Sequence, residues 1–143
     1  MDRKTAARAL FLCSSTERIL LNLRSPHKTH GLKWSLWGGM AEANETPLEC
    51  LSRELKEEMG EHPDIEKFYS VDIFQSPDKN FMYFSYVCIV REEFTPQLNN
   101  ENCGYCWTKL GVWPRPMHFG AKKSLCSKAS LAKLKFILSN HKD

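Results

Sequence analysis

The chain has 143 residues, of which 42% are hydrophobic and 26% charged, with a formal net charge of +3. These values are typical of one globular domain over residues 1–143 and argue against disordered, collagen-like and coiled-coil classes. No apolar stretch approaches the ~20 residues that span a bilayer, and a charge of +3 is too small to indicate nucleic-acid binding by itself.

The first half of the chain begins with a predicted β-hairpin. Short apolar runs at 9–13 and 19–23 flank the turn residues 14–17, which favours two antiparallel strands. A polar loop over 24–33 follows. Residues 34–37 then alternate as a short strand that ends at Gly38 and Gly39.

The clearest helix signature covers residues 46–59. Thr46 is a good N-cap, Pro47 suits the first helical position, and Glu49 completes a capping box. We expect Gly60 to end the helix in the left-handed conformation. One apolar face is expected, formed by Leu48, Leu51, Leu55 and Met59.

The second half of the chain predicts more strands and a final helix. Aromatic and β-branched residues fill 65–75 and 81–90, which favours a second hairpin, and 105–110 suits one more strand. Residues 121–140 fit a helix with Leu125, Ala129, Ala132 and Phe136 at near-helical spacing. The predicted fold class is therefore α+β, with a mixed sheet flanked by helices.

The six cysteines indicate reduced thiols. Cys13, Cys50 and Cys88 lie in apolar runs, where cysteine acts as a small hydrophobic residue. With only a weak apolar run near the N-terminus, we expect a cytoplasmic protein without membrane association. Cys103 and Cys106 have zinc-like spacing but lack a second ligand pair, so we expect ordinary strand residues.

Three glutamates on the first helix suggest a metal site. Glu54, Glu57 and Glu58 are spaced so that they project together, opposite the apolar face. Like charges so close repel each other, whereas Mg²⁺ or Mn²⁺ prefers such hard oxygen ligands. A solvated acidic face explains the helix equally well when it is considered alone.

The context of the helix favours the metal site. Reading from Gly39, the chain has five residues, Glu45, seven residues, Arg53-Glu54-Leu55, Lys56, Glu57-Glu58, Met59 and Gly60. This pattern resembles the signature box of the Nudix hydrolases, with eight fixed positions over about 23 residues. The one departure is Glu61, which replaces an apolar residue. The resemblance implies a single domain with a mixed β-sheet sandwiched between helices.

The resemblance also implies roles for the box residues. Nudix enzymes hydrolyse a diphosphate joined to a nucleoside, using Mg²⁺ with Mn²⁺ as a substitute. The implied metal ligands are Glu54, Glu57, Glu58 and the Gly38 carbonyl. Arg53 and Glu45 are expected to pair and hold the loop against the helix, so Arg53 orients the catalytic carboxylates.

The general base is open at this stage, because the family places it at different positions. Residues 101–107 resemble members with a glutamate ahead of a tryptophan-containing strand, which favours Glu101. Glu54 and Glu57 are the alternatives, and Glu92 and Glu93 are expected to be solvated.

Substrate contacts outside the box are expected to come from exposed aromatic and cationic side chains. Trp37, Phe74 and Tyr83 could stack on a base, although strand aromatics more often fill cores. Arg115 or His118, in the proline-containing stretch before the last helix, could bind an anion. His27, Lys28 and His30 could reach a phosphate, or simply form a solvated loop.

Three functions are compatible with these features. The first is a pyrophosphohydrolase for a small nucleotide such as a nucleoside triphosphate, an ADP-sugar or a dinucleoside polyphosphate. The second is an RNA 5′-end pyrophosphohydrolase, helped by the lysine-rich last segment but lacking an obvious RNA platform. The third is a non-catalytic nucleotide-binding module, which the intact glutamates argue against. A homodimer is compatible with all three.

Overall fold

The computed structural model describes residues 4–61 and 64–141, and β1 (Lys4–Cys13) lies at the centre of its seven-stranded sheet. This strand pairs antiparallel with β2 (Arg18–Arg24) and with β4 (Trp37–Met40). It also pairs in parallel with β6 (Phe81–Val90) along its whole length. The sheet is therefore mixed, as predicted.

The other strands extend this sheet on both sides. On one side, β3 (Trp34–Ser35) and β7 (Asn102–Lys109) both pair with β2. On the other, β5 (Lys67–Gln75) pairs with β6 and forms an edge. The β1–β2 and β5–β6 pairings are antiparallel, which confirms both predicted hairpins.

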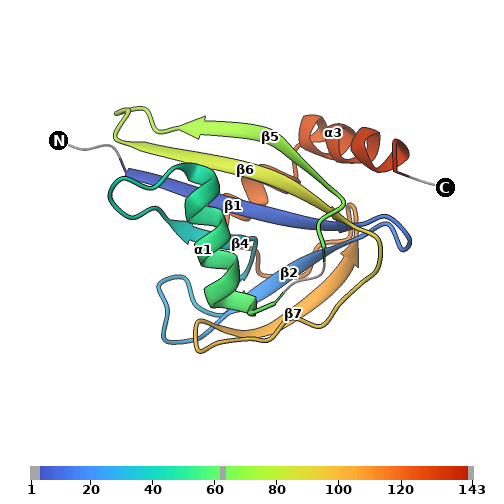
Figure 1. Ribbon diagram of the computed structural model, residues 1–143, viewed down its shortest axis with the longest axis horizontal. Coiled ribbons are helices and arrows are strands. Elements are labelled where there is room, and N and C mark those ends of the chain that lie inside the picture. The colour runs from blue at the N-terminus through green and yellow to red at the C-terminus, as the bar shows by residue number, and fades with distance from the viewer. Residues whose placement is uncertain (1–3, 62–63, 142–143) are drawn as a thin grey trace.

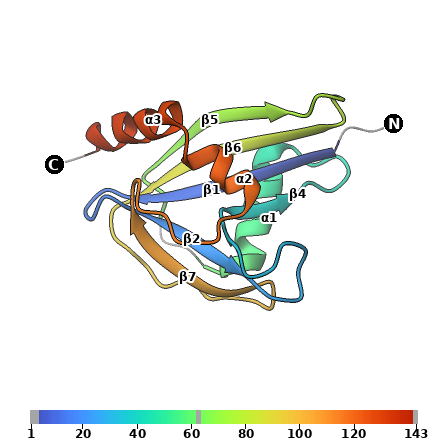
Figure 2. The ribbon, with the colours of Figure 1, turned by 180° about the vertical axis from the view of Figure 1, so that it is seen from behind.

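Helices cover both faces of the sheet, and each face has its own hydrophobic core (Figures 1 and 2). The helix α1 (Pro47–Met59) packs on the face that includes Phe11 of β1. The helices α2 (Phe119–Leu125) and α3 (Lys128–Ser139) pack on the face that includes Leu12. Successive side chains of β1 thus point to opposite faces of the sheet, as they do in any β-strand.

The C-terminal helix differs from the prediction, because it is interrupted before Lys128. Ser127 has an extended backbone and its hydroxyl accepts a hydrogen bond from the Ser130 N–H at 3.0 Å, so it starts a new helix. The predicted apolar row was wrong beyond Leu125: Ala129, Ala132 and Phe136 are exposed. The buried residues of α3 are instead Leu134, Ile137 and Leu138.

Strands β1, β2 and β7 are longer than predicted, and the strand expected over residues 34–37 is two strands. β1 begins at Lys4 because it pairs with β6 from Phe81 onward, and β7 begins at Asn102. β4 continues through both glycines to Met40 instead of ending at them.

Cys13, Cys50 and Cys88 are buried, as predicted from their apolar surroundings. Within the described residues, no helix combines the length and apolar character needed to cross a membrane.

Candidate active site

Strand β4 approaches two other elements closely at its two glycines. Gly38 has a φ of 135°, and a Cβ atom there would lie 2.0 Å from the Ala7 carbonyl oxygen. A Cβ atom on Gly39 would lie 2.5–2.6 Å from the carboxylate atoms of Glu54. Position 38 therefore requires glycine because its φ is positive and the Ala7 carbonyl is close. Position 39 requires glycine because the Glu54 carboxylate occupies the space that a side chain would need.

Helix α1 starts and ends at the expected residues. Thr46 and Glu49 form the predicted capping box, with N···O distances of 3.1 and 2.9 Å. At the other end, Gly60 has φ 66° and ψ −127°, so its φ is positive but the predicted left-handed helical conformation was wrong. Leu48 is 52% exposed, and the first turn buries Cys50 instead.

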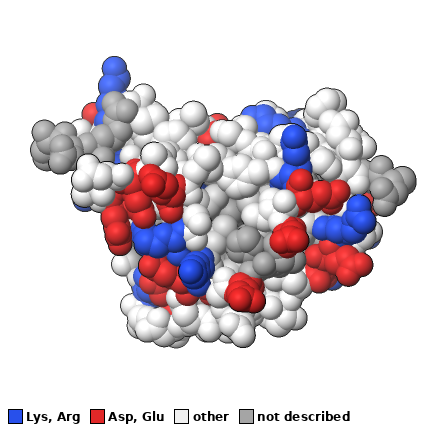
Figure 3. All heavy atoms as spheres, viewed as in Figure 1, with Lys and Arg blue, Asp and Glu red and all other residues white. Residues whose placement is uncertain are grey.

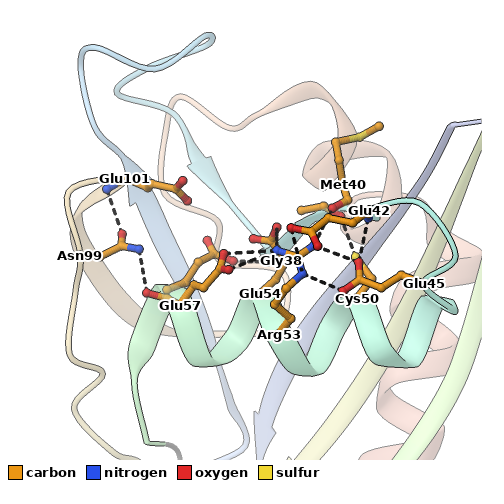
Figure 4. A network of polar contacts seen from close by, with 12 residues as sticks. Gly38, Met40, Glu42, Glu45, Cys50, Arg53, Glu54, Glu57, Asn99 and Glu101 are labelled. Atoms are coloured by element: carbon orange, nitrogen blue, oxygen red, sulfur yellow. Dashed lines mark hydrogen bonds and ion pairs between the residues drawn. The ribbon is translucent and has the colours of Figure 1, made fainter.

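Arg53 joins the loop before α1 to the acidic face of the helix (Figure 4). Its Nε and Nη2 donate to the two carboxylate oxygens of Glu45 at 2.7 and 3.0 Å, so the predicted pair is present. Nη2 also donates to the Met40 carbonyl oxygen at 3.0 Å, and Nη1 donates to Glu54 at 3.1 Å. The bonds to carboxylates raise the pKa of Arg53 and lower the pKa of Glu45.

Glu54 and Glu57 lie side by side, and both accept from Arg53. The Glu57 side chain is 54% exposed and accepts from Nη1 at 3.3 Å, whereas that of Glu54 is only 13% exposed. Burial raises the pKa of Glu54, and the Arg53 guanidinium partly offsets this. A partly buried carboxylate next to an exposed one leaves oxygen lone pairs available at the surface.

Glu58 differs from Glu54 and Glu57 in being buried and bonded on both carboxylate oxygens. It is 4% exposed; its Oε1 accepts from the Gly38 N–H at 2.6 Å and its Oε2 from Asn102 Nδ2 at 3.2 Å. Burial raises the pKa of Glu58 to about 7, against the opposing effect of these two hydrogen bonds. Glu58 thus ties α1 to β4 and β7 at the base of the site.

Glu101 lies across from Glu57, on the segment that leads into β7 (Figure 4). Its side chain is 41% exposed, and one carboxylate oxygen lies 3.6 Å from Lys28 Nζ. The side chain of Asn99 bonds both to the Glu101 backbone N–H and to the Glu57 carbonyl oxygen. Asn99 and Asn102 were not among the predicted site residues, and the one signal in the sequence was that asparagines 99, 100 and 102 surround Glu101.

The predicted substrate contacts are divided among several places. Trp37 was a wrong prediction, because it is fully buried and its Nε1 donates to the Leu20 carbonyl oxygen at 3.2 Å. Arg115 lines a hollow formed by residues 113–117 with Lys122 and Cys126, which contains no box residue. Phe74 and Tyr83 do lie together, in a different hollow.

That hollow lies between the sheet and the start of α2 and has a volume of about 390 Å³. Its walls include the aromatic rings of Phe74, Tyr83 and Phe119, together with Arg8 and His118. His118 Nδ1 accepts from the Gly120 N–H at 3.0 Å. Burial, with Arg24 and Arg8 nearby, lowers the pKa of His118 to about 4, so the ring is neutral at pH 7. Size and lining match a small-molecule pocket.

The oxygen-rich donor set suits Mg²⁺ or Mn²⁺ in kind. Acidic side chains gather around basic ones on the face that carries α1 (Figure 3). Among residues 4–61 and 64–141, however, no three Asp, Glu, His or Cys side chains are arranged to hold a metal ion. In this arrangement Glu58 bonds to Gly38 and Asn102, and Arg53 bonds to Glu54 and Glu57.

Comparison with known proteins identifies the family. The NUDIX domain model matches residues 2–126, which is most of the chain, and the chain therefore belongs to the Nudix hydrolase family. No sequence among curated proteins matches. A MutT NUDIX hydrolase from Burkholderia pseudomallei is similar in structure, with a TM-score of 0.68 and 19% identity. The similarity covers 90% of this chain and 99% of that one.

Two further solved structures share the fold. The NUDIX domain of NrtR from Shewanella oneidensis, solved with ADP ribose, has a TM-score of 0.71 and 15% identity over 95% of this chain and 90% of that one. A MutT/nudix family protein from Enterococcus faecalis has a TM-score of 0.61 and 23% identity over 75% of this chain. This chain covers only 44% of the Enterococcus protein.

Proposed function

We propose that this protein is a Mg²⁺-dependent pyrophosphohydrolase that cleaves the diphosphate linkage of a small nucleoside-diphosphate-X substrate. Suitable substrates are nucleoside triphosphates, ADP-sugars and dinucleoside polyphosphates. The observation that carries the proposal is the arrangement of Glu54 and Glu57, held by Arg53 beside the two glycines of β4. The NrtR domain bound to ADP ribose supports a nucleotide ligand by similarity.

The residues of the site divide the work of the reaction. Bound at Glu54, Glu57, Glu58 and the Gly38 carbonyl, Mg²⁺ would neutralise the diphosphate and lower the pKa of the attacking water. Arg53 keeps the carboxylates in place through its bonds to Glu45 and the Met40 carbonyl. Glu101, on the opposite side of the site, is the proposed general base that accepts the proton of that water.

The nucleoside is proposed to occupy the hollow beside Phe74 and Tyr83. Aromatic rings provide stacking surfaces for any base, since every base has a π-face. Arg8 lines this hollow. It also lies opposite Gly38 where β1 pairs with β4, so Arg8 borders both the hollow and the strand that carries the two glycines. Arg8 also provides a cation between the base and the reacting phosphates.

The test is a substrate panel with product identification. Nucleoside triphosphates, ADP-sugars, dinucleoside polyphosphates and 5′-triphosphorylated RNA are each incubated with Mg²⁺, with Mn²⁺ or with a chelator. We expect metal-dependent release of a nucleoside monophosphate from a small nucleotide. A strong preference for RNA would overturn the substrate class, and inactivity towards every compound would indicate a nucleotide-binding module.

Replacing the exposed metal-ligand candidate gives a sharper test. Glu57→Gln keeps the size of the side chain but removes its charge, so we expect hydrolysis to fall by at least about 10²-fold, the range for losing an essential catalytic group. The melting temperature should change little, because Glu57 is half exposed. Glu61→Gln, an exposed neighbour just past the helix, is the control. Wild-type turnover of Glu57→Gln at saturating Mg²⁺ would contradict the metal site.

A further inference from the structure

The segment before β7 is fastened to the end of α1 by one side chain, that of Asn99. Its Nδ2 donates to the Glu57 carbonyl oxygen at 2.7 Å, and its Oδ1 accepts from the Glu101 N–H at 2.9 Å. Figure 4 shows Asn99 between these two glutamates, with both carboxylates on the same side of the helix. Asn99 thus contacts the backbone of the helix that carries the box and the backbone of the proposed base.

Both bonds go to backbone groups at places where regular structure ends. The last four carbonyl groups of a helix have no partner within it. At the end of α1, Gly60 N–H bonds to Lys56 O, Asn99 Nδ2 to Glu57 O, and Gln97 N–H to Met59 O. The bond to the Glu101 N–H, two residues along, is the turn that asparagine forms with its own backbone. The amide therefore makes a helix cap and a loop turn at once.

The Glu101 side chain itself is loosely held. Its carboxylate lies 3.6 Å from Lys28 Nζ, beyond hydrogen-bond distance, and the side chain is 41% exposed. The Glu101 backbone is held on its other side by the Ser25 N–H, which donates to the Glu101 carbonyl at 2.9 Å. Asn99 is thus the side chain that links the Glu101 backbone directly to the Glu57 backbone, beside the bonds of Gln97 to Met59 and of Asn102 to Glu58.

We propose that Asn99 is a positioning residue: it fixes Glu101 relative to the carboxylates of α1 and thereby sets the rate of proton removal from the attacking water. This inference rests on the proposed function and on Glu101 as the base. Asn99 itself touches neither substrate nor metal in this assignment. Removing its amide should lower kcat and leave KM and the Mg²⁺ concentration for half-activation nearly unchanged.

The experiment is a double-mutant cycle on the full chain with the best substrate of the panel. Asn99→Ala removes both hydrogen bonds. Asn99→Ser keeps a weaker hydrogen bond to the Glu101 N–H, but its side chain is too short to reach the Glu57 carbonyl oxygen. We expect both to lower kcat about tenfold. Asn100→Ala, exposed and adjacent in sequence, is the matched control and should be unchanged. Asn99→Ser also provides the measurement if Asn99→Ala does not fold.

The cycle separates positioning from general damage. We expect Glu101→Gln to lower kcat about 10²-fold. Adding Asn99→Ala to it should lower kcat by less than twofold more, because the base is already lost. Independent, multiplicative losses would overturn the proposal, as would wild-type kcat in both Asn99 variants or in Glu101→Gln. These outcomes leave wild-type hydrolysis intact, whereas an inactive wild-type protein would instead refute the proposed function.

Discussion

At the scale of single residues, the site is organised by one cation among several carboxylates. Arg53 lies within 4.0 Å of Glu42, Glu45, Glu54 and Glu57, and its own side chain is 24% exposed. Carboxylates crowded in this way repel each other. Arg53 offsets this repulsion, and its bonds to Glu45 and the Met40 carbonyl hold the guanidinium next to the helix.

Gly39 gives the residue-scale prediction. In Gly39→Ala the new methyl group would overlap the Glu54 carboxylate, which lies at 2.5–2.6 Å from it, so Glu54 must move. We expect kcat/KM to fall by more than about tenfold, since misplacing a catalytic group by 1 Å is already costly. Gly104→Ala is the control, because its methyl group would make ordinary contacts at 3.5 Å with Leu23. Equal, small effects in both variants would contradict the close packing of Glu54.

Part of this site could be predicted from the sequence. The capping box follows from local helix geometry, whereas the Arg53–Glu45 pair was predicted from the resemblance to the Nudix signature box, since Glu45 lies before the helix. The inward turn of Glu58 could not be predicted, because its partner Asn102 lies 44 residues further along. The prediction that Trp37 contacts substrate was wrong for the same reason, because only the assembled sheet places its ring against Leu20.

At the scale of elements, an ion pair fixes the start of β2 to the chain that leaves β6. Arg18 donates through Nε to Glu93 at 2.6 Å, and its Nη2 contacts the other carboxylate oxygen. Glu93 was predicted to be solvated, but its side chain is only 20% exposed. The bidentate pairing explains the difference, since both carboxylate oxygens are bound.

This pair predicts a specific pH dependence. The hydrogen bonds from Arg18 lower the pKa of Glu93 in the folded protein. Its contribution is therefore complete above the unfolded pKa, about 4.3, and is lost as the pH falls through the lower folded pKa. With Arg18 39% exposed, we expect Glu93→Gln to cost less than about 1 kcal/mol at pH 7.

Thermal melts of wild type and Glu93→Gln at pH 7 and pH 3 provide the measurement. The difference in melting temperature should shrink at pH 3, and Glu92→Gln, its exposed neighbour, should show no difference at either pH. A gap that grows on acidification would have the wrong sign for a depressed carboxylate pKa.

At the scale of the whole molecule, β1 serves both halves of the proposed site. Phe11 lies in the core beneath α1, and Arg8 lines the hollow near α2. The same strand supplies the carbonyl of Ala7 against which Gly38 packs. The carboxylate helix and the hollow are thus positioned through one central strand, with a separate core on each face of the sheet.

Phe11 tests how far stability depends on this strand. It is fully buried and packs edge-on against Phe94 with ring centroids 5.4 Å apart. Phe11→Ala should cost about 3–5 kcal/mol, a large part of the stability of an ordinary domain. Phe136→Ala, exposed on α3, should cost less than about 0.5 kcal/mol. Urea unfolding measures both, and similar costs would contradict the assigned cores.

The parallel pairing of β1 with β6 has a consequence for how the chain folds. Every register pair in this ten-residue ladder joins residues 77 positions apart, as Lys4 and Phe81 do. The closure of such a long loop must precede any gain from the ladder, which makes folding slow. During synthesis β1 can pair with β2 and β4 before β6 has left the ribosome, and fragments that end before β6 would lack the parallel partner of their central strand.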